Sequence, residues 1–322
     1  MPETNPFFTL CIPVYNSGSI CHEAIQSALA QNFADYEIVI VDDNSSDNSW
    51  QVLSEYGKQA KIRLYRNEQN LGMTGNWNRC LELAKGNFIG FVHHDDAISP
   101  HFLSDAHEII TKNPSVGIMA FLNQNNQKRP LMGKIDHKNY FRATFSMIHV
   151  PPPSETIFIN EGLRYDSQMV YCPEIDLYLQ LSKLGYAAYH SDQVNVTRNP
   201  TKWTGSVTAK THYAFDRFQD NLYIIKKWRN DNWLNKNDAT NTLQTVSKEL
   251  LKRFVRGKIL GAKQANGLFE NYRHYLIENR YFGLTHWDKT KLFASVFPAV
   301  FFKIITSITF LMVSAFKRLI RK

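Results

Sequence analysis

Short apolar runs alternate with amphipathic stretches over the first hundred residues of the chain. Four runs have the length of strands and cover residues 8–16, 36–43, 62–67 and 87–96. The spacing of apolar residues between them predicts helices over residues 19–30, 45–56 and 75–84. Continuous apolar runs are typical of strands buried on both faces, as in parallel sheets. The alternation therefore predicts an α/β fold with a doubly wound, mainly parallel sheet flanked by helices.

The pattern weakens in the second half of the chain. Residues 117–160 are less regular, with loop composition at 123–130 and 151–154. Helical spacing returns over residues 174–185, and Gly185 is the expected stop. The following residues are rich in helix formers and aromatics. We divide the chain into a first domain over 1–205, a helical C-terminal extension over 206–290 and an apolar, basic tail over 291–322.

The tail changes the expected surroundings of the protein. Residues 251–322 hold 14 Lys or Arg against three Asp or Glu, a net charge of +11, whereas the whole chain carries +8. The longest apolar run, residues 304–316, is shorter than the roughly 20 residues that a spanning helix needs. We therefore expect an interfacial helix or a kinked hairpin on an anionic membrane surface. A core helix with a solvated basic end is the alternative, and nucleic-acid binding is disfavoured because aliphatic runs separate the basic residues.

Cysteine usage and the N-terminal sequence favour a cytoplasmic location. Cys11, Cys21, Cys80 and Cys172 are scattered without CxxC spacing, so we expect buried, reduced thiols. A strand pattern begins almost at once, and no basic patch precedes an apolar segment, so a signal peptide is not expected. With the tail, this predicts a peripheral or monotopic protein at the inner face of the plasma membrane.

The first two apolar strands each end in polar residues. The first ends in "CIPVYN" and the second in "VDDNSSD". In doubly wound sheets ligands bind beyond the carboxyl ends of the strands. Asp42 or Asp43 could accept hydrogen bonds from a nucleobase or a ribose hydroxyl. The alternative is that the polar residues after Asp43 only cap the next helix.

The fourth strand ends in "HHDD", His93 to Asp96. Two acids beside a histidine suit a divalent cation, because Mg²⁺ and Mn²⁺ prefer oxygen ligands and often bind through one or two carboxylates plus substrate phosphates. Turn formation and capping of the helix over residues 99–110 are the structural alternative.

A third acidic pair, Glu174 and Asp176, opens the helix over residues 174–185. Pro173 suits a first helical turn, and acids there complement the helix dipole, so a structural role is sufficient to explain them. A functional role requires one carboxylate to face the site as a general base.

In order along the chain, the segments "TLCIPVYN", "VDDNSSDNS", "NLGMTGNWN", "AKGNFIGFVHHDD" and "PEIDLYLQL" resemble the successive motifs of the family 2 glycosyltransferases. The resemblance covers roughly residues 7–200. It implies a GT-A fold, a nucleotide-diphosphate-sugar donor (a UDP-sugar foremost), a Mn²⁺ or Mg²⁺ ion and inversion at the anomeric carbon. With the tail, it also implies an acceptor on a lipid-linked or cell-surface glycan.

The resemblance assigns roles to individual residues, which follow. Those expected at the donor are Pro13, Tyr15, Asn16, Asp42, Asp43, Asn78, His94 and Asp95. Those expected at the metal are His93, Asp95 and Asp96. Glu174 is the expected catalytic base, and Asp176 takes that role if the register slips by two residues.

Three positions depart from the family pattern. His93 stands where the first acid of the Asp-x-Asp motif is usual, Trp77 where an arginine is usual, and Pro173 where the first acid of a Glu-Asp pair is usual. A catalytically weak nucleotide-sugar-binding protein is therefore one alternative. A nucleotidyltransferase is another, although residues 11–19 lack the glycine-rich, basic phosphate loop expected of that class. The oligomeric state is left open.

Overall fold

A computed structural model of the chain describes residues 5–125, 129–147, 150–198, 213–235, 237–243 and 245–246. The chain divides into two compact units. The first comprises Met1–Tyr213 with Asp231–Trp233, and the second Ala214–Asn230 with Leu234–Lys322. Among the described residues of the second unit, the main element is helix α7 (Tyr213–Trp228). The predicted tail over 291–322 lies outside the described residues.

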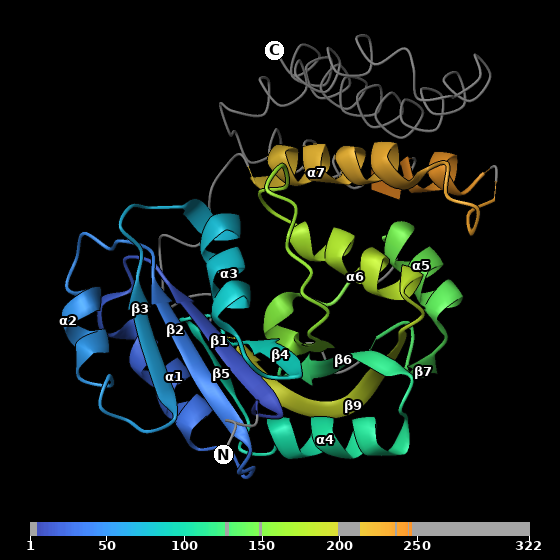
Figure 1. Ribbon diagram of the computed structural model, residues 1–322. Helices are drawn as coiled ribbons and strands as arrows, with labels where there is room; N and C mark the ends of the chain where they lie inside the picture. Colours follow the sequence, from blue (N-terminus) through green and yellow to red (C-terminus); the bar gives the residue numbers. More distant parts are fainter. Residues whose placement is uncertain are drawn as a thin grey trace, which may run out of the picture. The chain divides into compact units, whose positions relative to one another are not determined.

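The first unit is built on one nine-stranded sheet (Figure 1). Its strands are β1 (Phe8–Val14), β2 (Tyr36–Asp42), β3 (Ile62–Arg66), β4 (Phe88–Phe91), β5 (Asp96–Ile98), β6 (Val116–Asn123), β7 (Gly133–Ile135), β8 (Thr156–Ile159) and β9 (Ala187–Arg198). The order across the sheet is β3-β2-β1-β4-β8-β6-β9-β5, with β7 paired to β9. Strands β3, β2, β1 and β4 run parallel, as do β6 and β9, whereas β8, β5 and β7 pair antiparallel with their neighbours.

Helices cover both faces of this sheet (Figure 1). One face packs against α1 (Cys21–Leu29), α2 (Ser49–Ser54) and α4 (Phe102–Lys112). The other packs against α3 (Gly72–Leu83), α5 (His137–Phe145) and α6 (Pro173–Lys183). Two 3-10 turns lie at Gly18–Ile20 and Pro153–Glu155. Every residue of β1 is buried, as expected for a strand between two helical layers.

The predicted α/β fold with helices on both faces of the sheet is confirmed, and the helices and strands expected over the first hundred residues are all present. Residues 117–160 are more regular than expected, because most of β6, all of β7 and α5, and β8 lie there. Strand β6 is buried along its whole length, so it has no polar alternation to reveal it. Helix α5 begins where the Asp136 carboxylate accepts hydrogen bonds from the backbone N–H groups of Lys138 and Asn139.

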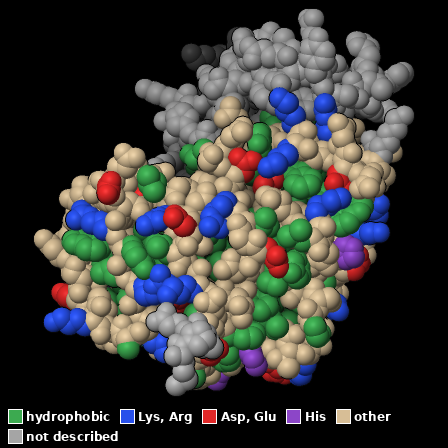
Figure 2. All heavy atoms as spheres, in the orientation of Figure 1, with side chains coloured by type: hydrophobic (Ala, Val, Ile, Leu, Met, Phe, Trp, Pro, Cys, Tyr) green, Lys and Arg blue, Asp and Glu red, His purple; other side chains and the backbone are tan. Residues whose placement is uncertain are grey.

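The predicted domain boundary at residue 205 lies in an interval outside the described residues and stays a prediction. All four cysteines are buried thiols, as expected. Within the described part of the chain, no helix is long and apolar enough to cross a bilayer. On the face drawn in Figure 2, lysine and arginine side chains lie scattered between acidic and apolar ones over the described surface.

Candidate active site

The sheet order brings three polar strand ends together. Strand β1 lies between β2 and β4, and all three run parallel, so their carboxyl ends share one edge. The Asp43 N–H donates to the Val14 carbonyl at 2.8 Å, and the Val92 N–H donates to the Cys11 carbonyl at 2.9 Å. The segments after β2 and β4 therefore both continue beside β1, at the edge where open α/β sheets bind ligands.

The Asp42 carboxylate makes structural contacts at this edge of the sheet. Its side chain is fully buried, and the Ser45 hydroxyl donates to its Oδ1 at 2.5 Å. Its Oδ2 lies 3.2 Å from Nε of Arg66. Both carboxylate oxygens therefore fix the loop after β2, which assigns Asp42 a structural role at the expected donor site.

The Asp43 carboxylate, in contrast, is hydrogen-bonded to described residues through only one of its oxygens. Its Oδ1 accepts hydrogen bonds from Asn67 Nδ2 and from the Leu71 N–H, both at 2.8 Å. Among the described residues no hydrogen bond is made to Oδ2. The carboxylate is thus fixed in orientation by Oδ1 alone within the described part of the chain.

The end of β1 is tied to the same loop. The Asn16 backbone has a positive φ of 48°, its N–H donates to the Ser45 hydroxyl, and its Oδ1 accepts from the Ser46 N–H, both at 2.9 Å. The amide of Asn16 therefore shapes the loop. The neighbouring Tyr15 ring is 41% exposed, so its face is available for stacking.

His94 connects β1 to the turn after β4. Burial lowers the pKa of its imidazole, and a hydrogen bond to the Pro13 backbone opposes this shift. The Pro13 backbone and His94 thus join the expected nucleoside side of the site to the expected metal side.

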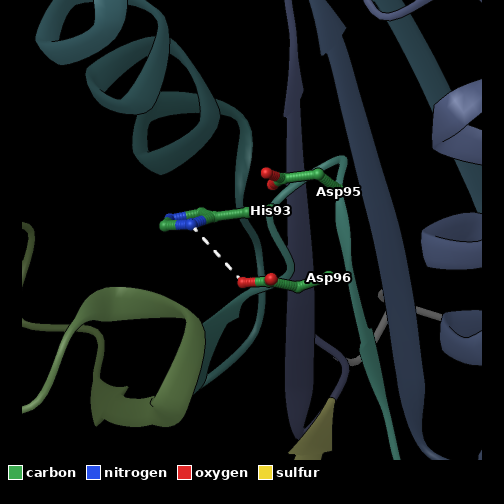
Figure 3. Close-up of side chains that lie close together, drawn as sticks. All are labelled: His93, Asp95 and Asp96. Atoms are coloured by element: carbon green, nitrogen blue, oxygen red, sulfur yellow. Dashed lines mark ion pairs between the residues drawn. The ribbon is translucent and has the colours of Figure 1, made fainter. Parts of the chain in front are cut away.

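The turn between β4 and β5 gathers three possible metal ligands. One ligand atom from each of His93, Asp95 and Asp96 lies within 4.8 Å of the other two. Figure 3 shows the three side chains projecting to the same side of this turn. His93 Nδ1 lies 3.8 Å from Asp96 Oδ2, and the Asp96 side chain is 5% exposed.

The imidazole of His93 is stacked on the indole of Trp77. Their ring centroids are 5.3 Å apart with an interplanar angle of 24°. Burial lowers the pKa of His93 to about 4, against the opposing charge of Asp95. His93 is therefore neutral near pH 7, the state in which an imidazole can bind a metal ion. Its Nε2 is buried and has no hydrogen-bond partner among the described residues.

An ion-pair network of residues far away in sequence reaches Asp96. Arg198, at the end of β9, places Nε 3.9 Å from Asp96 Oδ2 and Nη1 3.6 Å from Glu155 Oε1. Glu155 also pairs with the buried Arg129 at 2.5 Å and accepts from Asn123 Nδ2 at 2.7 Å. Sequence reasoning missed this network, since no local motif marks residues that meet only through the pairing of β5 with β9.

The two acids that begin α6 differ in their surroundings. Asp176 is fully buried and accepts a hydrogen bond from Gln180 Nε2 at 2.7 Å. Glu174 is 8% exposed. Burial raises the pKa of the Tyr165 and Tyr178 hydroxyls, and the nearby charge of Glu174 raises them further. The Glu174 carboxylate therefore lies close to these two phenols on the α3–α6 face of the sheet.

Tyr165 links that region to the candidate metal ligands. Its ring meets Trp77 edge-on with centroids 5.4 Å apart, and Trp77 in turn stacks on His93. Asn78 fixes the Tyr165 backbone, donating from Nδ2 to its carbonyl at 2.9 Å and accepting from its N–H at 2.8 Å. Both ends of the Asn78 amide are thus engaged, so Asn78, which is expected at the donor, fixes this segment against α3.

A sequence profile described as Glycosyl transferase family 2 matches residues 9–169, half of the chain. The chain belongs to this family. An uncharacterized glycosyltransferase of Nostoc sp. is 36% identical over 115 residues, which cover 35% of this chain and 36% of that protein. TarS of Staphylococcus aureus, a poly(ribitol-phosphate) beta-N-acetylglucosaminyltransferase, is 33% identical over 111 residues, 34% of this chain and 19% of TarS. The matches thus span about a third or less of these curated relatives.

Solved structures show that this family 2 chain has a GT-A fold. TarS residues 1–349 with UDP-GlcNAc superpose with a TM-score of 0.60 at 19% identity, covering 76% of this chain and 72% of that one. The mannosyltransferase PcManGT of Pyrobaculum calidifontis, with GDP-Man and Mn²⁺, superposes with a TM-score of 0.58 at 14% identity, covering 91% and 86%.

Proposed function

We propose that this family 2 chain is an inverting glycosyltransferase that moves a sugar from a nucleotide-diphosphate sugar to an acceptor hydroxyl. The observation that carries the proposal is the placement of Asp43 and the ligand trio His93, Asp95 and Asp96 on either side of β1. One site can thus bind a nucleoside at one end and a metal-bound diphosphate at the other. TarS with UDP-GlcNAc and PcManGT with GDP-Man support a nucleotide-sugar donor, and we expect a UDP-sugar.

Residues at the ends of β1 and β2 bind the nucleoside. Asp43 Oδ2 accepts from a base N–H or a ribose hydroxyl, while Oδ1 stays anchored by Asn67 and the Leu71 N–H. The exposed ring of Tyr15 stacks on the base. Asp42 and Asn16 hold the loop that carries these groups.

The residues after β4 fit a divalent cation. They offer two carboxylates and a neutral imidazole whose ligand atoms lie within 4.8 Å of one another. We assign Asp95, Asp96 and His93 as the ligands of Mn²⁺ or Mg²⁺. Such an ion neutralises charge on the departing diphosphate.

We assign the general base to Glu174. Its carboxylate takes the proton of the acceptor hydroxyl as that oxygen bonds to the anomeric carbon and the bond to the diphosphate breaks. The incoming oxygen and the leaving group occupy opposite faces of the sugar, so a single displacement inverts the anomeric centre. Asp176 is held by Gln180 and serves the start of the helix.

The acceptor proposal rests on the composition of the tail. A basic, apolar segment on an anionic membrane surface would place the site beside a lipid-linked or cell-surface glycan. We therefore propose a peripheral or monotopic location at the inner face of the plasma membrane.

A donor screen tests the proposal. Purified protein is incubated with UDP- and GDP-sugars and with Mn²⁺ or Mg²⁺, and release of the nucleoside diphosphate is measured with and without glycan acceptors. We expect metal-dependent turnover of one donor that Asp95→Asn abolishes. Binding of a donor without turnover under any condition would instead indicate a sugar-nucleotide-binding protein.

A further inference from the structure

The stacked pair of Trp77 and His93 gives the ligand trio an unusual donor set. Among these three side chains, His93 supplies the nitrogen and the two aspartates supply oxygen. We propose that this pair makes the site selective for Mn²⁺ over Mg²⁺, with His93 Nδ1 as a ligand and Trp77 as the residue that positions it. The inference rests on the proposed metal-dependent transfer and specifies its cation.

Trp77 is rigidly held, so it can fix the plane of the imidazole. The indole is 6% exposed. Its ring centroid lies 5.7 Å from that of Phe91 and 5.4 Å from that of Tyr165, in addition to the stack on His93 at 5.3 Å. A ring packed among other rings in this way has little room to rotate. Rotation of His93 away from the aspartates would require loss of the stack.

The fixed imidazole presents Nδ1 to the aspartates. The distance of 3.8 Å between His93 Nδ1 and Asp96 Oδ2 exceeds that of a hydrogen bond. Two ligands of a small octahedral ion, each about 2.1 Å from it, are about 3 Å apart in cis and about 4 Å apart in trans. The observed separation lies between these values. The full trio, within 4.8 Å, needs only a small contraction to bind one ion.

The donor set discriminates between cations. Mg²⁺ is a hard ion that strongly prefers oxygen and near-ideal octahedral geometry. Mn²⁺ shares the preference of Mg²⁺ for carboxylate oxygen, but as a first-row transition ion it also binds at sites that supply a nitrogen ligand. A neutral histidine in place of a carboxylate also removes one negative charge, and Arg198 adds a positive charge 3.9 Å from Asp96. The electrostatic attraction of the site is therefore weakened for every divalent ion. Of Mn²⁺ and Mg²⁺, only Mn²⁺ recovers this loss through its bond to the His93 nitrogen.

Metal titration of the full chain tests the inference without relying on turnover. Mn²⁺ and Mg²⁺ are titrated separately by calorimetry, alone and with UDP present. For the native protein we expect the Mn²⁺ dissociation constant to be at least about tenfold below that of Mg²⁺. The electron spin-echo envelope modulation spectrum of bound Mn²⁺ should show hyperfine coupling to a directly bound nitrogen.

Three variants separate the role of His93 as a ligand from the role of Trp77 in positioning it. His93→Asp should reduce the Mn²⁺-to-Mg²⁺ affinity ratio about tenfold and abolish the nitrogen coupling. Trp77→Leu, which keeps an apolar side chain, should weaken Mn²⁺ binding severalfold with little change for Mg²⁺. His101→Asp makes the same charge change at an exposed residue and should leave the ratio unchanged.

The outcomes distinguish this inference from the proposed function. Turnover with Mn²⁺ bound, no nitrogen coupling and an unchanged ratio in His93→Asp would overturn the selectivity and leave the transferase intact. Equal affinity of the native protein for Mn²⁺ and Mg²⁺ would also overturn the selectivity and leave the proposed transferase intact. Binding of neither ion, with or without UDP, would contradict both.

Discussion

At the residue scale, neighbouring acids with similar sequence signals have different environments. Asp42 and Asp43 follow the same strand, yet Asp42 uses both oxygens on Ser45 and Arg66, whereas Asp43 anchors only Oδ1. Consecutive residues of a strand face opposite sides of the sheet, so a slip of one residue exchanges their roles. Sequence alone left both as candidates for the nucleoside contact.

Asp43→Asn should weaken donor binding and preserve the fold. An asparagine oxygen can still accept from Asn67 and the Leu71 N–H, but the charged acceptor for the nucleoside is lost. A hydrogen bond to a charged group contributes about 1.5–3 kcal/mol, so we expect UDP affinity to fall about 10- to 100-fold. Calorimetric titration measures it. Native affinity in a folded Asp43→Asn protein would exclude this contact.

Glu174→Gln should lower kcat by about 100- to 10,000-fold, the range for loss of a general base, with donor affinity close to native. Asp176→Asn is the matched control, because asparagine can still accept from Gln180 at the start of α6. Its kcat should stay within a few-fold of native. Steady-state kinetics on both variants decides which carboxylate is the general base. A large loss of kcat in Asp176→Asn with near-native kcat in Glu174→Gln would assign the base to Asp176.

At the element scale, local patterns predicted the parallel half of the sheet and long-range pairing decided the rest. The apolar runs of β1, β2 and β4 gave their strand identity and placed polar residues at one edge. Nothing in the sequence of β9 indicates that Arg198 reaches Asp96, because that contact depends on β5 pairing with β9. The stack of Trp77 on His93 was equally hidden, since α3 and the β4 turn meet only after the sheet has formed. In sequence, Trp77 was visible only as a departure from a family pattern, whereas His93 was already a candidate metal ligand.

Gly86→Ala should destabilise the first unit, because Gly86 sits tightly against β1. An added Cβ would lie 2.4 Å from the Thr9 nitrogen and 2.6 Å from the Phe8 carbonyl carbon, both backbone atoms that cannot rotate away. Overpacking of this kind costs about 1–3 kcal/mol or more. Gly57→Ala is the matched control, since its Cβ would meet its nearest atom at 3.4 Å. Thermal unfolding followed by circular dichroism should show a clear drop in midpoint for Gly86→Ala only, and equal midpoints would contradict the packing.

At the scale of the whole molecule, charge separates the tail from the rest of the chain. Residues 251–322 carry a net charge of +11, and the preceding 250 residues carry −3. This asymmetry, together with the apolar runs of the tail, supports attachment to an anionic surface.

The full chain should float with anionic vesicles, and a chain ending at Thr290 should not. Basic residues near an anionic membrane contribute about 1 kcal/mol each, so replacing Lys317, Arg318, Arg321 and Lys322 by glutamine should weaken binding strongly while keeping the apolar run. Zwitterionic vesicles serve as the control. Equal flotation of the full and shortened chains would remove the tail from membrane binding.

The central claim is that a nucleoside diphosphate binds this chain through a cation held by the turn after β4. Titration of UDP into the native protein and Asp95→Asn, each with and without Mn²⁺, tests it most directly. The account predicts that Mn²⁺ raises UDP affinity at least about tenfold in the native protein and not in the variant. UDP affinity that is the same in all four titrations would contradict it.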